Sequence, residues 1–80
     1  MDKTAFSASQ LRLREFLREL RNAAGLRQVD LAARLQEPQS FVSKYESGER
    51  RLDFIEVFEV CKALGITLTD FVRRFEDSDK

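Results

Sequence analysis

The chain has 80 residues, 42% of them hydrophobic, which is enough for one small core but not for a second domain. Fourteen basic and fourteen acidic side chains cancel, so the overall positive charge that many nucleic-acid-binding proteins carry is absent. The sequence has no histidine and one cysteine, which excludes a zinc finger, a disulfide framework within the chain and a histidine-based catalytic triad.

We predict a single domain over residues 1–80, with an ordered core at about 7–76 and short flexible ends. No apolar run is long enough for a secretory signal or a membrane span, which predicts a cytoplasmic protein. The cysteine, Cys61, has apolar neighbours and no basic residue placed to hold a thiolate. We therefore interpret it as a buried packing residue.

The first predicted helix begins with a capping sequence and ends at a glycine. Ser7 and Gln10 have the spacing of a capping box, and Gly25 allows the left-handed turn that closes a helix. Between them, apolar residues recur at the spacing of one helical face: Leu13, Phe16, Leu17, Leu20 and Ala24.

Two short helices follow, joined by a three-residue turn. The first is predicted near residues 28–35. It stops there because Pro38 follows closely, and neither a proline nor the residue before it continues a helix easily. Pro38 is tolerated at or just before the first position of the next helix, which is predicted to run to Ser47 and to end at Gly48.

The second of these helices has a polar face that is rich in amides and hydroxyls. At about 100° per residue, this face fills an arc of about 140° and contains Gln39, Ser40, Ser43, Lys44 and Ser47. Amides and hydroxyls suit hydrogen bonding to base edges in a DNA major groove. A surface helix that is merely solvated remains the alternative interpretation.

Two further helices complete the pattern. The fourth is predicted after a loop at 49–53 and runs to Leu64, with one apolar stripe made of Phe54, Val57, Phe58, Cys61 and Leu64. The fifth begins with a cap at 67–70 and carries Leu68, Phe71, Val72 and Phe75. The phenylalanines of this last helix have two interpretations, packing within the chain or an exposed dimer patch.

Charge is unevenly distributed along the neutral chain. Residues 1–51 contain ten basic and seven acidic side chains, whereas residues 52–80 contain four basic and seven acidic ones. The acidic excess is therefore concentrated away from the two short helices, which permits nucleic-acid binding by that part of the chain.

Five segments together resemble the Cro/C1-type helix-turn-helix family, also called the Xre family, over roughly residues 10–76. They are Leu17-Arg18-Glu19-Leu20-Arg21, Gly25-Leu26-Arg27-Gln28, Leu31-Ala32, Val42-Ser43-Lys44-Tyr45-Glu46 and Gly48-Glu49-Arg50. The resemblance implies an all-α, five-helix bundle of the lambda-repressor-like DNA-binding type, with the helix-turn-helix formed by helices 2 and 3. It further implies a transcriptional regulator, most simply a repressor, that binds a palindromic operator in double-stranded DNA as a homodimer.

The resemblance also implies roles for individual residues. The base-reading positions match Gln39, Ser40 and Lys44. The phosphate-contacting and positioning residues match Gln28, Ser43, Arg50 and Arg51, with Gln28 bracing Gln39. A structural ion pair, which ties the first helix to the end of the third, matches Arg21 and Glu46.

The chain departs from the family pattern at the start of helix 2 and in the turn. Arg27 stands where Ser or Thr usually caps helix 2, so we expect Asp30 to reach back as the cap. Gln36 stands where the turn normally has glycine. If this position needs a positive φ, strain follows, and we expect the turn to rearrange around Pro38.

A second function remains compatible with the same fold. In an antitoxin-like protein or another protein-interaction module, the apolar terminal helix would bind a protein partner. Enzymatic activity is not expected, because no nucleophile has a base nearby and no phosphate-binding loop is present. We predict no cofactor, no metal, no small-molecule substrate and no membrane partner.

Overall fold

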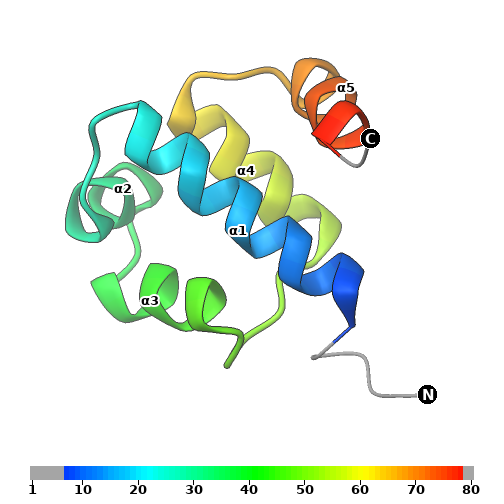
Figure 1. The fold of residues 1–80 in the computed structure, drawn as a ribbon. Coiled ribbons are helices and arrows are strands. Elements are labelled where there is room, and N and C mark those ends of the chain that lie inside the picture. The colour runs from blue at the N-terminus through cyan, green and yellow to red at the C-terminus, as the bar shows by residue number, and fades with distance from the viewer. Residues whose placement is uncertain (1–6, 79–80) are drawn as a thin grey trace.

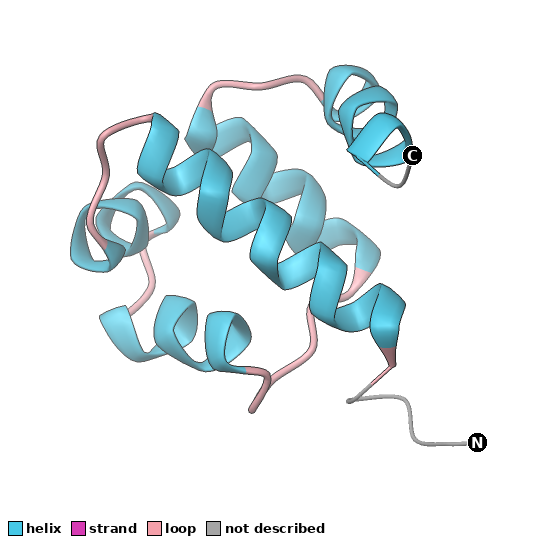
Figure 2. Ribbon diagram, in the orientation of Figure 1, coloured by secondary structure: helices cyan, strands magenta, loops and turns pink. Residues whose placement is uncertain are grey.

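Five helices follow one another in the computed structural model, which describes residues 7–78 (Figure 1). Figure 2 shows short loops between them, and no strand occurs within the described range. The predicted all-α, five-helix fold is confirmed. The helices are α1 (Ala8–Ala23), α2 (Gln28–Leu35), α3 (Gln39–Ser47), α4 (Phe54–Leu64) and α5 (Leu68–Ser78).

Polar side chains start the helices at the positions that the sequence indicates. The Ser7 hydroxyl accepts a hydrogen bond from the backbone N–H of Gln10 at 3.0 Å at the start of α1. The Thr67 hydroxyl accepts one from the backbone N–H of Asp70 at 3.1 Å at the start of α5. Each bond satisfies a donor that the helix itself leaves unpaired.

The core draws one or more side chains from every helix. Its most buried members are Leu17, Leu31, Val42, Tyr45, Val60, Cys61 and Phe71. Cys61 has no exposed surface, and burial raises the pKa of its thiol to about 11. A thiol in such surroundings stays protonated at neutral pH, which fits the predicted packing role.

The α5 phenylalanines pack inside the chain. Phe71 is buried, and its ring centroid lies 5.5 Å from that of Phe16 on α1. Phe75 lies 5.7 Å from the same ring, and the guanidinium of Arg12 sits 4.0 Å above the Phe75 centroid. Of the two interpretations of α5, the structure therefore supports packing within the chain.

The apolar stripe predicted for α4 is wrong in part. Phe54 is 67% exposed and Phe58 is 36% exposed, although both were expected in the core. The buried face of α4 is centred instead on Val57, Val60 and Cys61. At 100° per residue this centre lies about 110° from Phe58, which turns the side chain outward.

The turn between α2 and α3 keeps a left-handed residue. Gln36 has φ 58° and ψ 40°, and it is the only non-glycine residue with a positive φ in the described part of the chain. The Gln36 and Glu37 backbone N–H groups donate to the carbonyls of Ala33 and Ala32, as at a regular helix end. The expected rearrangement around Pro38 is thus not seen, and the conformational strain stays at Gln36.

We expect Gln36→Gly to raise the free energy of unfolding by about 0.5–1 kcal/mol, because glycine adopts a positive φ without steric cost. The matched control is Ala33→Gly, an exposed position inside α2, which we expect to lower stability by about 1 kcal/mol. Urea unfolding followed by circular dichroism measures both changes. Equal losses in the two variants would show that Gln36 is not strained.

Candidate nucleic-acid interface

One face of α3 points away from the core. Gln39, Ser40 and Lys44 are exposed and Ser43 is half-buried, whereas Val42 and Tyr45 on the other face are buried. In Figure 1, α3 lies at the opposite end of the molecule from α5. The polar face is therefore accessible to a large ligand without displacement of other elements.

A buried ion pair joins α1 to the end of α3. Arg21 Nε lies 2.7 Å from Glu46 Oε2, and Arg21 Nη2 donates to Glu46 Oε1 at 3.0 Å. The third donor, Nη1, bonds the carbonyl oxygen of Leu26 at 2.7 Å. Hydrogen bonding to Glu46 raises the pKa of Arg21 above its usual value. The two side chains retain only 9% and 4% of their exposed surface, so the pair is fixed inside the protein.

The same carboxylate orients a side chain on α2, which in turn contacts α3. Glu46 Oε1 accepts a hydrogen bond from Gln28 Nε2 at 2.9 Å, and Gln28 Oε1 accepts one from Gln39 Nε2 at 3.3 Å. Because an ionised carboxylate only accepts, the NH₂ group of Gln28 must face Glu46 and its oxygen must face Gln39. We name the four residues Arg21, Glu46, Gln28 and Gln39 the bracing network.

The bracing network leaves part of the Gln39 amide for a ligand. One N–H is used on Gln28, so the second N–H and the carbonyl oxygen remain. A donor and an acceptor side by side match N7 and N6 of adenine in the major groove. The link from Gln28 to Glu46 was missed by the sequence analysis, which assigned the two residues to separate roles.

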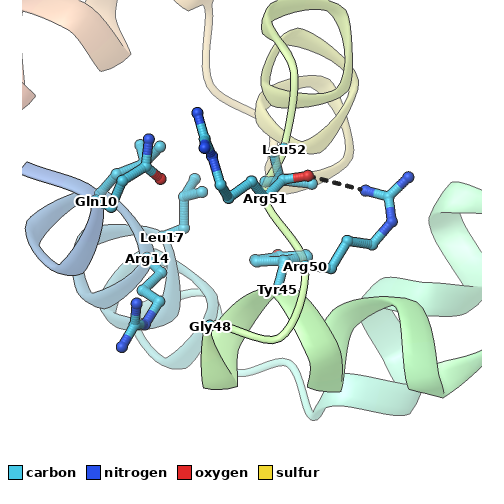
Figure 3. Close-up of a pocket in the computed structure, with 9 residues that line it drawn as sticks. Gln10, Arg14, Leu17, Tyr45, Gly48, Arg50, Arg51 and Leu52 are labelled. Atoms are coloured by element: carbon cyan, nitrogen blue, oxygen red, sulfur yellow. Dashed lines mark hydrogen bonds between the residues drawn. The ribbon is translucent and has the colours of Figure 1, made fainter. Parts of the chain in front are cut away.

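The basic side chains after α3 differ in their surroundings. Both terminal nitrogens of Arg50 donate to Glu56, at 3.0 and 2.6 Å, and its guanidinium lies 4.7 Å from the Phe41 ring centroid. This pairing raises the pKa of Arg50 and lowers the pKa of Glu56. A phosphate at Arg50 therefore has to share the guanidinium with Glu56. Figure 3 shows the Arg51 side chain directed away from that of Arg50.

A small pocket separates the start of α1 from the loop after α3 (Figure 3). It has a volume of about 10 Å³, which is room for about one water molecule. The buried Tyr45 hydroxyl has no hydrogen-bond partner among residues 7–78, and it belongs to this pocket. Arg14 closes one side, since a Cβ placed on Gly48 would be 2.8 Å from its guanidinium carbon. The pocket is too small for an organic ligand.

The start of α2 is capped as expected from the sequence. Asp30 Oδ2 accepts a hydrogen bond from the backbone N–H of Arg27 at 2.8 Å, and Oδ1 lies 2.9 Å from Arg27 Nη2. These bonds lower the pKa of Asp30 to about 2. The carboxylate is thus ionised at neutral pH and forms the half of a capping box that reaches back to the N-cap backbone, as the sequence predicts.

Residues 7–78 offer neither a membrane span nor a metal cluster. None of the described helices combines the length and the apolar character that crossing a membrane requires. The same residues contain no cluster of three or more metal-binding side chains. We take the polar face of α3 with its bracing network as the candidate site, because its side chains are exposed and Gln39 is held in place through Gln28.

Comparisons with known proteins give one matching family model and two similar folds. Residues 17–71 match a helix-turn-helix family model. The fold is similar to an XRE-family like protein from Pseudomonas syringae pv. tomato str. DC3000, with 44% identity and a TM-score of 0.82, covering 91% of this chain and 89% of that one. It is also similar to the clp gene regulator ClgR from C. glutamicum, with 24% identity, a TM-score of 0.75 and coverage of 90% and 92%. The second likeness concerns the fold alone. Comparison with curated protein sequences gives no significant match.

Proposed function

This chain belongs to the Cro/C1-type helix-turn-helix family, also called the XRE family, and on that premise we propose that it is a sequence-specific DNA-binding transcriptional regulator. The observation that carries the proposal is the exposed amide of Gln39, which is held through Gln28 by the buried Glu46. A side chain that reads bases gains from being oriented before it binds.

In the proposed complex, α3 enters the major groove of double-stranded DNA. Gln39 pairs with an adenine through its N6 and N7 atoms, while Ser40 and Lys44 contact neighbouring base edges. All three side chains are exposed on one face of α3, which supports this assignment. The contacts with the bases specify the sequence, and contacts with phosphates fix the position of the protein.

The proposed phosphate contacts flank α3. Gln28 and Ser43 are half-buried beside the polar face, and Arg51 is exposed in the loop that follows. Arg50 adds a fourth contact when its guanidinium is shared between a phosphate and Glu56. Because only two of these four side chains are basic, each copy makes few charged contacts with phosphates. One copy alone therefore binds DNA weakly.

We further propose that the protein acts as a homodimer on a palindromic operator and represses by occupying a promoter. Two half-sites about 34 Å apart place two copies of α3 in successive major grooves. Coupling two weak binding events then gives a tight complex. In the antitoxin-like alternative the apolar terminal helix binds a protein partner, and the packing of Phe71 and Phe75 on Phe16 leaves less apolar surface on that helix for a partner.

Selection of bound duplexes from a random pool at low salt tests the proposal. We expect enrichment of a palindrome, and an affinity for it that falls about tenfold in Lys44→Ala, because a contact in the groove is lost. The control Arg73→Ala removes an exposed positive charge from α5, far from the proposed interface, and is expected to leave affinity unchanged. Failure to enrich any sequence would contradict the proposed function.

A further inference from the structure

The hydrogen bonds of the bracing network run in one direction, from the surface to the interior. The exposed Gln39 donates through Nε2 to Oε1 of the half-buried Gln28 at 3.3 Å. Gln28 in turn donates through Nε2 to Oε1 of Glu46 at 2.9 Å, and the Glu46 side chain is only 4% exposed. A carboxylate inside the protein is thus linked, through one amide, to a side chain on the proposed DNA-binding face.

This direction is fixed as long as residue 46 is a carboxylate. The oxygen and the NH₂ group of a carboxamide have nearly the same size, so an amide can turn over without a steric clash. If Gln28 turned over, its oxygen would lie against Glu46 Oε1, and two acceptors would face each other away from solvent. Arg21 keeps the carboxylate in place with Nε at 2.7 Å and Nη2 at 3.0 Å. The oxygen of Gln28 therefore faces Gln39.

We propose that Glu46 determines which base Gln39 reads and that it selects adenine over guanine, an inference that rests on the proposed function. With one N–H used on Gln28, the Gln39 amide retains one donor and one acceptor. Adenine offers the complementary pair, N7 and the N6 amino group, whereas guanine offers two acceptors, N7 and O6. Opposite guanine, the Gln39 oxygen faces O6 and the two repel. Glu46 itself does not contact DNA and is a positioning residue.

The opposite direction of the amides gives the opposite preference. If Gln28 turns over, its NH₂ group donates to the Gln39 oxygen, and both N–H groups of Gln39 become available. Two donors match N7 and O6 of guanine. A network that only immobilised Gln39 would change the affinity for every base alike. The base preference therefore separates a directed network from a rigid one.

The direction of the network affects one base pair of each half-site. The other proposed base-reading side chains, Ser40 and Lys44, are exposed on the same face. A serine hydroxyl rotates between donating and accepting, and a lysine ammonium group only donates. What these two side chains offer to a base does not depend on Glu46. The position to measure is the one whose adenine preference is lost in Gln39→Ala.

The substitution Glu46→Gln tests the proposal, because an amide at this position donates as well as accepts and no longer imposes one direction on Gln28. Fluorescence anisotropy compares the selected palindrome with the same duplex carrying guanine in place of that adenine. The wild-type chain is expected to prefer adenine by roughly 10- to 100-fold. We expect the ratio of the two dissociation constants to fall about fivefold in the variant, the effect of one neutral hydrogen bond. Circular dichroism checks folding.

A second variant leaves the buried ion pair intact. Gln28→Met keeps the length of the side chain and removes the bond to Gln39, so both N–H groups of Gln39 are released and the same fall in the ratio is expected. The control is Arg51→Ala, an exposed arginine in the loop, which weakens binding to both duplexes equally because phosphate contacts carry no sequence information. An unchanged ratio in Gln28→Met, or guanine at this position in the wild-type palindrome, would overturn the proposal.

Side-chain hydrogen exchange, measured by NMR in the protein without DNA, separates the two levels of the argument. The NH₂ group of Gln28 is expected to exchange more slowly than that of the exposed Gln36, because it is bonded to the enclosed Glu46. If Gln28 is protected but no duplex is enriched, the proposed function fails and the base preference fails with it, while the network stands. If a palindrome is enriched but Gln28 exchanges as fast as Gln36, the function stands and the role of Glu46 is refuted.

Discussion

Arg21→Ala is expected to lower the free energy of unfolding by about 3 kcal/mol, a large share of the total for a domain of this size. The loss arises because Glu46 keeps only 4% of its side-chain exposure and would be left as a buried, unpaired charge. The Leu26 carbonyl loses its partner in the same variant. Urea unfolding measures the change, with Arg18→Ala as the control because Arg18 is an exposed arginine on the same helix.

A second variant separates stability from orientation. Replacing both charges, in Arg21→Met/Glu46→Leu, removes the uncompensated charge and is expected to restore most of the stability, as exchanges of buried pairs for apolar residues often do. Gln28 still loses the acceptor that directs its amide. Operator affinity should therefore remain low in a well-folded protein. Normal affinity in the double variant would show that the bracing network does not position Gln39.

Gln39→Ala is expected to weaken operator binding by about 1–3 kcal/mol, or roughly 10- to 100-fold, and to abolish the preference for adenine at one position of each half-site. The reason is the loss of a paired donor and acceptor at the start of α3. The measurement is fluorescence anisotropy against the selected palindrome and its single-base variants. Ser47→Ala is the matched control, since the Ser47 hydroxyl is already bonded to the Lys44 carbonyl at 3.1 Å.

A double-mutant cycle with Gln28→Ala tests whether the two amides act together. Because Gln28 Oε1 accepts the Gln39 hydrogen bond, removing either side chain is expected to reduce the effect of removing the other. The bond is long at 3.3 Å, so the coupling should be modest. Strictly additive losses would mean that Gln39 binds DNA without help from Gln28.

Local signals made most of the fold predictable. Proline, glycine and capping residues act on their neighbours alone, and the bounds of α2 and the caps at Ser7, Asp30 and Thr67 follow from such signals. The rotation of α4 about its own axis depends instead on which of its apolar side chains pack against the other helices. Val60 lies outside the predicted stripe, yet it has no exposed surface. The spacing of apolar residues therefore predicted a buried Phe58 where the structure buries Val60.

The turn and the bracing network show two other limits of the sequence. The sequence indicated the cost of a positive φ at Gln36, but not whether the contacts of α2 with α3 would outweigh that cost. Likewise, Gln28 and Glu46 are 18 residues apart, and their hydrogen bond uses the same carboxylate that the ion pair with Arg21 holds. Contacts of this type depend on three helices meeting at one point.

The locked loop between α3 and α4 has a consequence for the spacing of operators. Arg50 is bonded to both Lys44 and Glu56, so the loop fixes the orientation of α3 relative to α4 within each copy of the proposed homodimer. One base pair inserted between the half-sites shifts the second groove by about 3.4 Å and rotates it by about 34°. In the proposed homodimer the braced loop after α3 does not absorb that displacement, so we expect the length of the central spacer to matter as much as the bases themselves.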